Sequence, residues 1–94
     1  MILGYRDRRT ELFAAGSFVA AFGGFEAQAE RRMSILNAAT SLDTLRRLPS
    51  NRLEALRGAR AGQYSIRINR QWRICFTWAD GEPWPSEVEI VDYY

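Results

Sequence analysis

The sequence predicts a small α+β domain in which an N-terminal strand and helices pack on one face of an antiparallel sheet. Two patterns carry this prediction. Apolar residues recur at helical spacing over residues 25–39, and they alternate with polar residues over residues 64–78. Helices followed by a run of strands is the order of a two-layer α+β fold. Because a chain of 94 residues has room for one core, residues 1–94 are expected to form a single domain.

The first part of the chain predicts a short strand and a short helix. The apolar run at residues 2–5 favours the strand. Asp7 is a suitable N-cap for a helix over residues 8–15. Gly16 then tolerates the left-handed backbone position at which many helices end.

The clearest helix is expected over residues 25–39, and another turn or two should follow before Pro49. One stripe of this helix carries apolar side chains at spacings of four, four and three residues: Phe25, Ala29, Met33 and Leu36. Three leucines spaced three apart continue the pattern: Leu42, Leu45 and Leu48. Such stripes form protein core more often than binding surfaces, so we assign them to the core.

The second half of the chain predicts a β-hairpin after a loop over residues 49–62. Alternation gives one apolar face, made of Tyr64, Ile66, Ile68, Trp72, Ile74, Phe76 and Trp78. The opposite face, expected to be wet, receives Ser65, Arg67, Arg73, Cys75 and Thr77. A three-residue loop at 69–71 preserves both faces because it pairs Ile68 with Trp72. Asn69 in this loop tolerates the left-handed backbone that such loops often need.

This register places Arg67 directly opposite Arg73 on the sheet. Like charges at opposed positions destabilise a sheet, whereas an opposite pair contributes roughly 0.2–1 kcal/mol. Stability alone therefore does not favour the arginine pair. Either Glu87 or Glu89, on a third strand expected over residues 87–91, relieves the repulsion, or the pair holds an external anion.

All thirteen basic residues are arginines, and they are unevenly distributed. Residues 46–73 contain eight arginines and one acid (8 − 1 = +7), whereas residues 74–94 contain five acids and no basic residue (−5). Guanidinium groups match phosphates in geometry and charge, which favours a basic surface that binds a polyanion. The alternative is that the acidic C-terminal strand neutralises the basic hairpin.

The absence of histidine and the single cysteine restrict the chemistry. Without histidine the chain lacks the commonest general base and the commonest metal ligand, so we expect neither a metal site nor a cofactor. Cys75 alternates with apolar neighbours in a strand, which favours a packing role over a nucleophilic one. One cysteine excludes an internal disulfide, and no segment resembles a signal peptide or a membrane span. We expect a cytoplasmic protein.

Three motifs resemble those of the HigB (host inhibition of growth) toxins of the RelE/ParE superfamily. They are GQYSIRIN, QWRICF and the terminal IVDYY, and the resemblance covers essentially the whole chain. It implies a small RelE-like fold and a toxin of a type II toxin–antitoxin system, a metal-independent endoribonuclease that cleaves mRNA on the ribosome. It also implies a HigA-type antitoxin with a helix-turn-helix fold as the partner, in addition to the ribosome and mRNA.

The resemblance also implies the site residues. Arg73 follows the tryptophan of QWR and matches the catalytic arginine of the family. Asp92 and Tyr93 match a terminal Asp-Tyr pair, whereas Tyr94 stands where most relatives have histidine. Together with the basic stretch, the resemblance gives an RNA-binding set of Arg57, Arg60, Arg67 and Arg70.

The chemistry of metal-free RNA cleavage fits these residues. The 2′-hydroxyl attacks the adjacent phosphorus, so the reaction needs a base, an acid and positive charge near the phosphate oxygens. Arginines supply the charge, and the proton transfers are left to Asp92, Tyr93, Tyr94 or the terminal carboxylate. Two competing interpretations remain: a structural one, in which Arg73 forms an ion pair with Glu89, and a non-catalytic one, in which the protein is a ParE-like gyrase poison or only docks on RNA.

Overall fold

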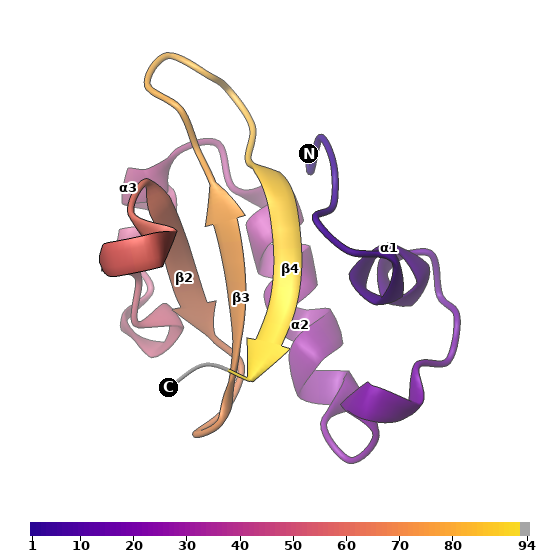
Figure 1. Ribbon diagram of the computed structural model, residues 1–94. Helices are drawn as coiled ribbons and strands as arrows, with labels where there is room; N and C mark the ends of the chain where they lie inside the picture. The colour runs from indigo at the N-terminus through magenta and orange to yellow at the C-terminus, as the bar shows by residue number, and fades with distance from the viewer. Residues whose placement is uncertain (93–94) are drawn as a thin grey trace.

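The computed structural model describes residues 1–92 and confirms the predicted α+β class (Figure 1). Its helices are α1 (Arg8–Ala14), α2 (Glu26–Ala38) and α3 (Leu42–Arg46). Its strands are β1 (Glu54–Ala55), β2 (Gln63–Arg67), β3 (Trp72–Thr77) and β4 (Ser86–Asp92), ordered β1-β2-β3-β4 in one antiparallel sheet. Helix α2 crosses behind the sheet in Figure 1 and α1 lies beside β4, while the other face of the sheet points to the viewer.

The predicted register of the hairpin is confirmed. Strands β2 and β3 pair Ile66 with Ile74, which keeps the apolar face continuous, and they pair Arg67 with Arg73. Strand β4 is the third strand that the sequence predicts, and it pairs antiparallel with β3. The two arginines are therefore directly opposed, as the alternation of faces requires.

The loop between β2 and β3 has the predicted length, but Asn69 stabilises it in a different way from the one predicted. The Ile68 N–H donates to the Trp72 carbonyl at 3.0 Å and closes the loop. Asn69 does not have a positive φ. Instead, its Oδ1 accepts the backbone N–H groups of Gln71 and Trp72, each at 2.8 Å. The side chain of Asn69 thus satisfies the backbone donors of the turn, and no left-handed residue is needed.

The predicted core lies between α2 and the sheet. The whole stripe of α2 is buried and belongs to the same cluster as the inner residues of the strands: Phe25, Ala29, Met33, Leu36, Ile66, Ile74 and Phe76. Trp72 contributes by stacking on Phe25, with ring centroids 4.9 Å apart, and by an edge contact with Phe22 at 5.7 Å. The assignment of the apolar face to the helices is therefore confirmed.

The leucine pattern after α2 holds only in part. Leu45 is fully buried and Leu42 is half-buried, but Leu48 is 40% exposed. Helix α3 ends at Arg46, and the chain then enters a 3₁₀ turn at Pro49–Asn51. The third leucine is therefore no longer on the helix that would have turned it towards the core. The predicted loop that follows also contains the short edge strand β1 and a second 3₁₀ turn at Gly58–Arg60.

Helix α1 is capped as predicted and is tied to β4. The Oδ1 atom of Asp7 accepts the Thr10 N–H at 3.2 Å, and Gly16 after the helix has φ +95°. Thr10 is fully buried, and its Oγ1 accepts the Ile90 N–H at 3.0 Å. Because this bond uses an edge N–H of the sheet, α1 covers the outer side of β4 and protects it from pairing with another chain.

The predicted N-terminal strand is not formed as a full strand. Tyr5 makes a single parallel bridge with Val88, and backbone bonds join Leu3 to Pro85 and Gly4 to Val88. The chain then turns into α1 at the Asp7 cap, which ends the pairing after one bridge. The same segment packs on α2, where Asn37 Oδ1 accepts the Ile2 N–H at 3.0 Å.

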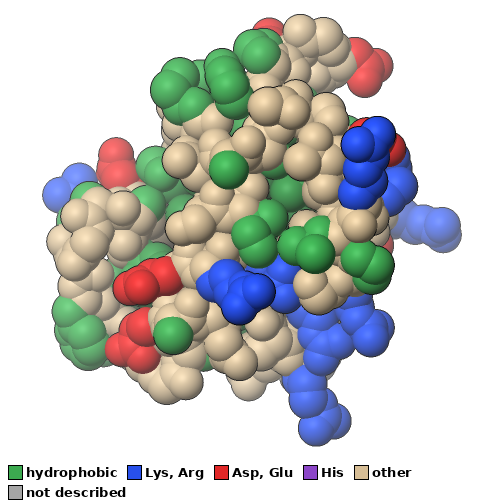
Figure 2. All heavy atoms as spheres, turned by 180° about the vertical axis from the view of Figure 1, so that it is seen from behind, with side chains coloured by type: hydrophobic (Ala, Val, Ile, Leu, Met, Phe, Trp, Pro, Cys, Tyr) green, Lys and Arg blue, Asp and Glu red, His purple; other side chains and the backbone are tan. Residues whose placement is uncertain are grey.

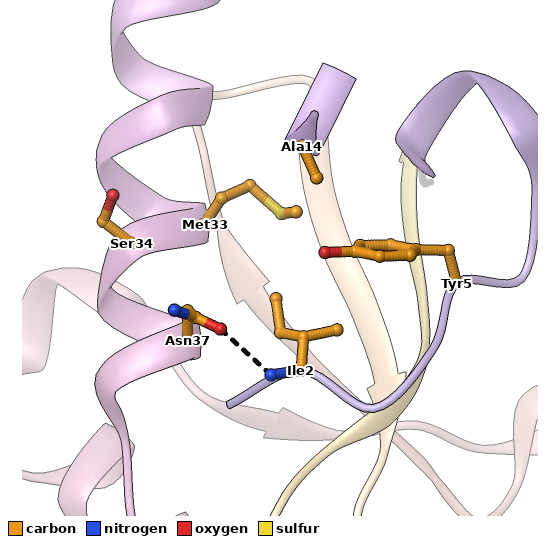
Figure 3. Close-up of a pocket in the computed structure, with 6 residues that line it drawn as sticks. All are labelled: Ile2, Tyr5, Ala14, Met33, Ser34 and Asn37. Atoms are coloured by element: carbon orange, nitrogen blue, oxygen red, sulfur yellow. Dashed lines mark hydrogen bonds between the residues drawn. The ribbon is translucent and has the colours of Figure 1, made fainter. Parts of the chain in front are cut away.

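A hollow of about 220 Å³ lies between the N-terminal segment and the helices (Figure 3). Its lining residues are Ile2, Tyr5, Ala14, Met33, Ser34 and Asn37. Burial, and secondarily the negative charge of Glu11, raises the pKa of the Tyr5 phenol above its ordinary value. Within residues 1–92, none of the predicted site residues lines this hollow, so it is separate from the described part of the site that the sequence indicates.

Candidate functional site

The face of the sheet that points away from α2 has an apolar centre. Leu56, Cys75 and Val91 form a small buried cluster there, so the expectation of a fully wet face is wrong at this point. Leu56 begins the segment that leads through the 3₁₀ turn Gly58–Arg60 in front of β2 (Figure 1). Cys75 is only 1% exposed, and burial raises the pKa of its thiol, an effect that Arg60 partly opposes. Cys75 therefore packs, as predicted from its neighbours.

Arg67 and Arg73 lie at the end of this face that adjoins the hairpin loop. Arg73 Nη1 donates to Ser65 Oγ at 2.9 Å, and Ser65 is fully buried. Arg67 Nε donates to the Asn69 carbonyl at 3.0 Å. Within residues 1–92, neither guanidinium forms an ion pair with a carboxylate. Each arginine is thus held in place by a neutral acceptor, and no carboxylate of the described residues compensates its positive charge.

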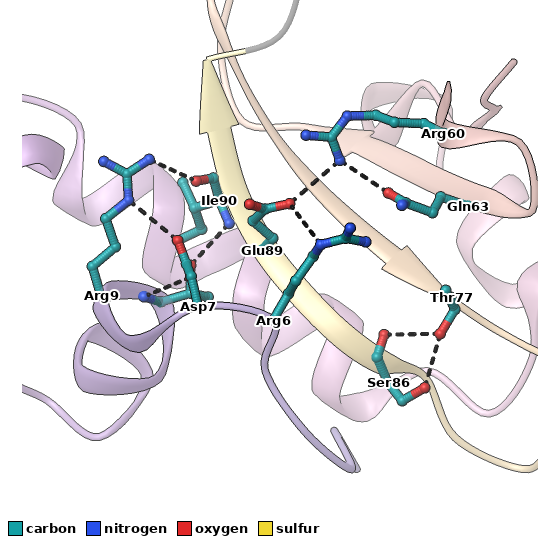
Figure 4. Close-up of polar contacts among 10 residues, drawn as sticks. Arg6, Asp7, Arg9, Arg60, Gln63, Thr77, Ser86, Glu89 and Ile90 are labelled. Carbon is teal, nitrogen blue, oxygen red and sulfur yellow. Dashed lines mark hydrogen bonds and ion pairs between the residues drawn. The ribbon is translucent and has the colours of Figure 1, made fainter. Parts of the chain in front are cut away.

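Glu89 does not relieve the repulsion between these arginines. Its Oε1 lies 3.3 Å from Arg60 and 3.9 Å from Arg6, and Arg60 Nη1 also contacts Gln63 Oε1 at 3.0 Å (Figure 4). The structural interpretation that paired Glu89 with Arg73 is therefore wrong. The other acid considered, Glu87, is exposed at a bulge of β4 with φ +50°, and the described residues include no ion pair to it.

Asp92 ends β4 beside the hairpin loop and not beside Arg73. It pairs with Trp72 in the sheet, so its side chain alternates away from the face that carries Arg73. Its Oδ2 accepts Gln71 Nε2 at 2.8 Å. The structure thus brings Arg67 and Arg73 together but places Asp92 at the adjacent edge. Tyr93 and Tyr94, the other two predicted catalytic residues, lie outside the described residues.

The remaining predicted RNA-binding residues occupy different places around this face. Arg57 is exposed directly before the 3₁₀ turn that passes in front of β2. Arg70 is exposed in the hairpin loop next to Arg67. Arg60 is held by Glu89 and Gln63, so its charge is already partly compensated within the protein.

The arginines separate into two groups. Six form ion pairs with carboxylates: Arg6, Arg8, Arg9, Arg46, Arg47 and Arg60. The other seven (13 − 6) have no such partner in the described part of the chain: Arg31, Arg32, Arg52, Arg57, Arg67, Arg70 and Arg73. The acidic C-terminal strand therefore neutralises one arginine of the basic stretch, Arg60, and leaves the hairpin charged.

Two residues that the sequence did not single out organise the site. Ser65 positions Arg73, and Gln71 fixes the end of β4 through Asp92. The sequence does carry a signal for Ser65: it is a small polar residue between two apolar ones in the strand, and alternation places it on the same face as the arginines. Gln71 carries no comparable signal, because its partner is 21 positions away in the chain.

Neither a metal cluster nor a membrane helix is found in the described residues. No group of three or more His, Cys, Asp or Glu side chains is arranged to hold an ion within residues 1–92. None of the helices in the same range is long and apolar enough to cross a bilayer.

Comparison with known proteins identifies the family of the chain. The family described as RelE-like toxin of type II toxin-antitoxin system HigB matches residues 23–94, which is most of the chain. The chain belongs to this HigB-like toxin family. A curated relative, Toxin HigB-1 of Vibrio cholerae serotype O1, is 47% identical over 51 residues, and this match spans 54% of each chain. The match thus extends over about half the length of that relative.

The fold of this HigB-like toxin also resembles that of a solved structure. A YoeB/ParE toxin from Agrobacterium tumefaciens aligns with a TM-score of 0.59 over 99% of this chain and 98% of the other. Because only 14% of the aligned residues are identical, this likeness concerns the fold alone. It agrees with the small RelE-like fold that the motifs implied.

Proposed function

We propose that this HigB-like toxin is a ribosome-dependent endoribonuclease that cleaves mRNA without a metal ion. One observation carries the proposal: Arg67 and Arg73 are directly opposed on β2 and β3, and no carboxylate in residues 1–92 pairs with either. Such an arrangement opposes folding, because like charges on facing strands repel. A bound phosphate between the two guanidinium groups would convert this repulsion into attraction.

The proposed reaction transfers the phosphoryl group within the RNA. The 2′-hydroxyl loses its proton to a base, its oxygen forms a bond to phosphorus, and the bond to the 5′-oxygen breaks as that oxygen takes a proton from an acid. The products are a 2′,3′-cyclic phosphate and a free 5′-hydroxyl. Arg73, oriented by Ser65, would stabilise the charge that develops on the phosphate oxygens, with Arg67 beside it.

The proton transfers are assigned to the C-terminal residues. Arginine is a poor acid or base because its pKa lies above about 12. Asp92, one of the candidates, accepts a hydrogen bond from the side chain of Gln71. We therefore assign to Asp92 the role of fixing the end of β4, after which Tyr93 and Tyr94 follow in the chain. A tyrosine, with an ordinary pKa near 10, can exchange protons near neutral pH only where cations such as Arg67 and Arg73 lower that pKa.

Binding of RNA is assigned to the arginines around the open face. Arg57 and Arg70 are exposed and have no carboxylate partner in the described residues, so they are available to phosphates. Arg60 would contact phosphates while it stays paired with Glu89. We further propose that the protein works in the cytoplasm and that a HigA-type antitoxin with a helix-turn-helix fold holds it inactive.

The test is induced expression of the toxin in cells, followed by mapping of mRNA 5′ ends. We expect new 5′ ends within translated codons for the wild type and none for Arg73→Ala. Arg8→Ala, which removes a charge whose partner is the exposed Glu11, is the matched control and should cleave as the wild type does. Growth arrest without new 5′ ends, together with loss of gyrase activity, would instead indicate a ParE-like poison.

A further inference from the structure

A second group of unpaired arginines surrounds a groove between α2, the turn at Pro49–Asn51 and the hairpin loop. The groove encloses about 450 Å³, and its lining residues are Gln28, Arg32, Ser50, Arg52, Arg67, Ile68, Asn69 and Arg70. Seen from behind, arginine side chains gather at the lower right of the molecule, on the side where the hairpin loop and this turn lie (Figure 2). Four guanidinium groups thus come from three separate parts of the chain.

Arg32 is built into the wall of this groove. Its Nη1 donates to Asn51 Oδ1 at 2.8 Å and to Ser50 Oγ at 3.3 Å. Asn51 is fully buried, and its Nδ2 donates to the Leu45 carbonyl at 3.0 Å. The position of the Arg32 guanidinium is therefore fixed from behind by a satisfied polar network. Burial, and then the neighbouring charge of Arg31, lowers the pKa of Arg32 from its ordinary value. The guanidinium nevertheless stays cationic near neutral pH, as arginine does in proteins.

Arg52 is held at a backbone conformation that its side chain does not favour. Its φ of +46° lies in the left-handed region, where residues other than glycine and asparagine are uncommon. This backbone strain is present with or without a ligand. The convergence of four like charges also opposes folding, and a bound anion would relieve that repulsion. In the described residues, no carboxylate pairs with any of the four arginines.

We propose that the groove binds neighbouring phosphates of an RNA strand, at a site separate from the phosphate that is cleaved. The proposal rests on the proposed function, because Arg67 belongs to both places: it lines the groove and is opposed to Arg73 in the sheet. A strand that crosses the open face near Arg73 therefore reaches the groove at the hairpin loop. Among the described residues, Ile68 is the one apolar side chain in the lining, so a peptide would find little surface for an apolar anchor.

Salt dependence of binding tests this site directly. The probe is a 2′-O-methyl RNA oligonucleotide, which the toxin cannot cleave because the attacking hydroxyl is blocked. The groove variant is Arg52→Asn with Arg70→Gln, where asparagine suits the left-handed position. The control is Arg46→Gln with Arg47→Gln, which removes two charges that pair with Asp43 outside the groove. Thermal melts establish that both proteins are folded.

The groove variant should give a plot of log affinity against log salt that is shallower by about 1.4, since each phosphate contact on a single strand contributes roughly 0.7. The control should keep the wild-type slope. Equal slopes for the two variants would overturn the proposal, as would a groove variant that loses affinity for polyglutamate but not for the oligonucleotide. Absence of mRNA cleavage by the wild type would refute the proposed function while leaving the binding result standing, because the probe is not cleaved.

Discussion

On the face of the sheet that α2 covers, β3 presents Ile74 and Phe76, which are fully buried among apolar neighbours. On the opposite face the same strand presents Arg73, half-buried and facing a second arginine. Stability explains every residue of the first face, because each removes apolar surface from water. It does not explain the arginine pair on the second face, where stability would favour replacement of one arginine by an acid. The difference marks the open face as the one shaped by a ligand.

The largest effect should come from the covered face. Truncation of Phe76 to alanine is expected to lower the free energy of unfolding by about 3–5 kcal/mol, because it removes a fully buried ring from the centre of the core. Urea unfolding followed by circular dichroism measures this change. Arg47→Ala, at an exposed position of the same chain, should cost less than about 0.5 kcal/mol. Equal effects of the two substitutions would contradict the assignment of faces.

Ser65→Ala tests whether the open face is organised for catalysis. The variant loses the acceptor that holds Arg73 Nη1, so we expect cleavage to fall by up to about 10²-fold through misplacement of the guanidinium. The stability change should remain near 1 kcal/mol, the typical value of one hydrogen bond. Single-turnover cleavage at saturating ribosomes, measured beside the unfolding curve, separates the two effects. A loss of stability with unchanged cleavage would make Ser65 a purely structural residue.

Removal of one charge from the open face should stabilise the protein. Arg67→Gln eliminates the opposed like charges, and the free energy of unfolding should rise by roughly 0.2–1 kcal/mol at low salt. High salt should reduce this gain, because screening weakens the repulsion in the wild type. Arg57→Gln, exposed and without an opposed arginine in the sheet pairing, is the control and should leave stability unchanged. A destabilised Arg67→Gln protein would mean that the repulsion is already compensated.

The smallest effect concerns Cys75, the apolar centre of the open face. Because burial raises the pKa of the thiol, the thiolate is disfavoured at neutral pH, and alkylation by iodoacetamide should be slow in the native protein. Folding thus favours the neutral thiol, so this contribution to stability is present below the ordinary thiol pKa and is lost as the pH rises through the raised value. Mass spectrometry with and without urea measures the rate. Fast labelling of the folded protein at pH 7 would contradict a packed cysteine.

The sequence predicts the hairpin accurately because the two faces restrict the register. Only a three-residue loop keeps Ile66 opposite Ile74, and the opposition of Arg67 and Arg73 then follows. Other features depend on contacts that no local pattern encodes. The N-terminal segment looks like a strand, but the Asp7 cap ends its pairing after one bridge.

The arginine groove is another feature that the sequence alone does not predict. Arg32 and Arg52 are separated in sequence from the hairpin loop, and only the folded chain brings them to one groove. The arginines of residues 46–73 also cannot be distinguished by charge along the sequence. In the structure, ion pairs remove Arg46, Arg47 and Arg60 from the unpaired group. The pairs with Asp43 are local, at i,i+3 and i,i+4 spacing on one helix, whereas the partner of Arg60, Glu89, could be assigned only after folding.

The most direct test of the open face is the rate at which Arg73→Gln cleaves mRNA on programmed ribosomes. Glutamine retains a polar side chain with hydrogen-bond donors but removes the charge, so the substitution tests the electrostatic role itself. The rate constant should fall by about 10²–10³-fold, the usual loss when one contact to developing charge is removed. A folded Arg73→Gln toxin that cleaves within about threefold of the wild-type rate would contradict the account, because the charge on this face would then serve neither stability nor catalysis.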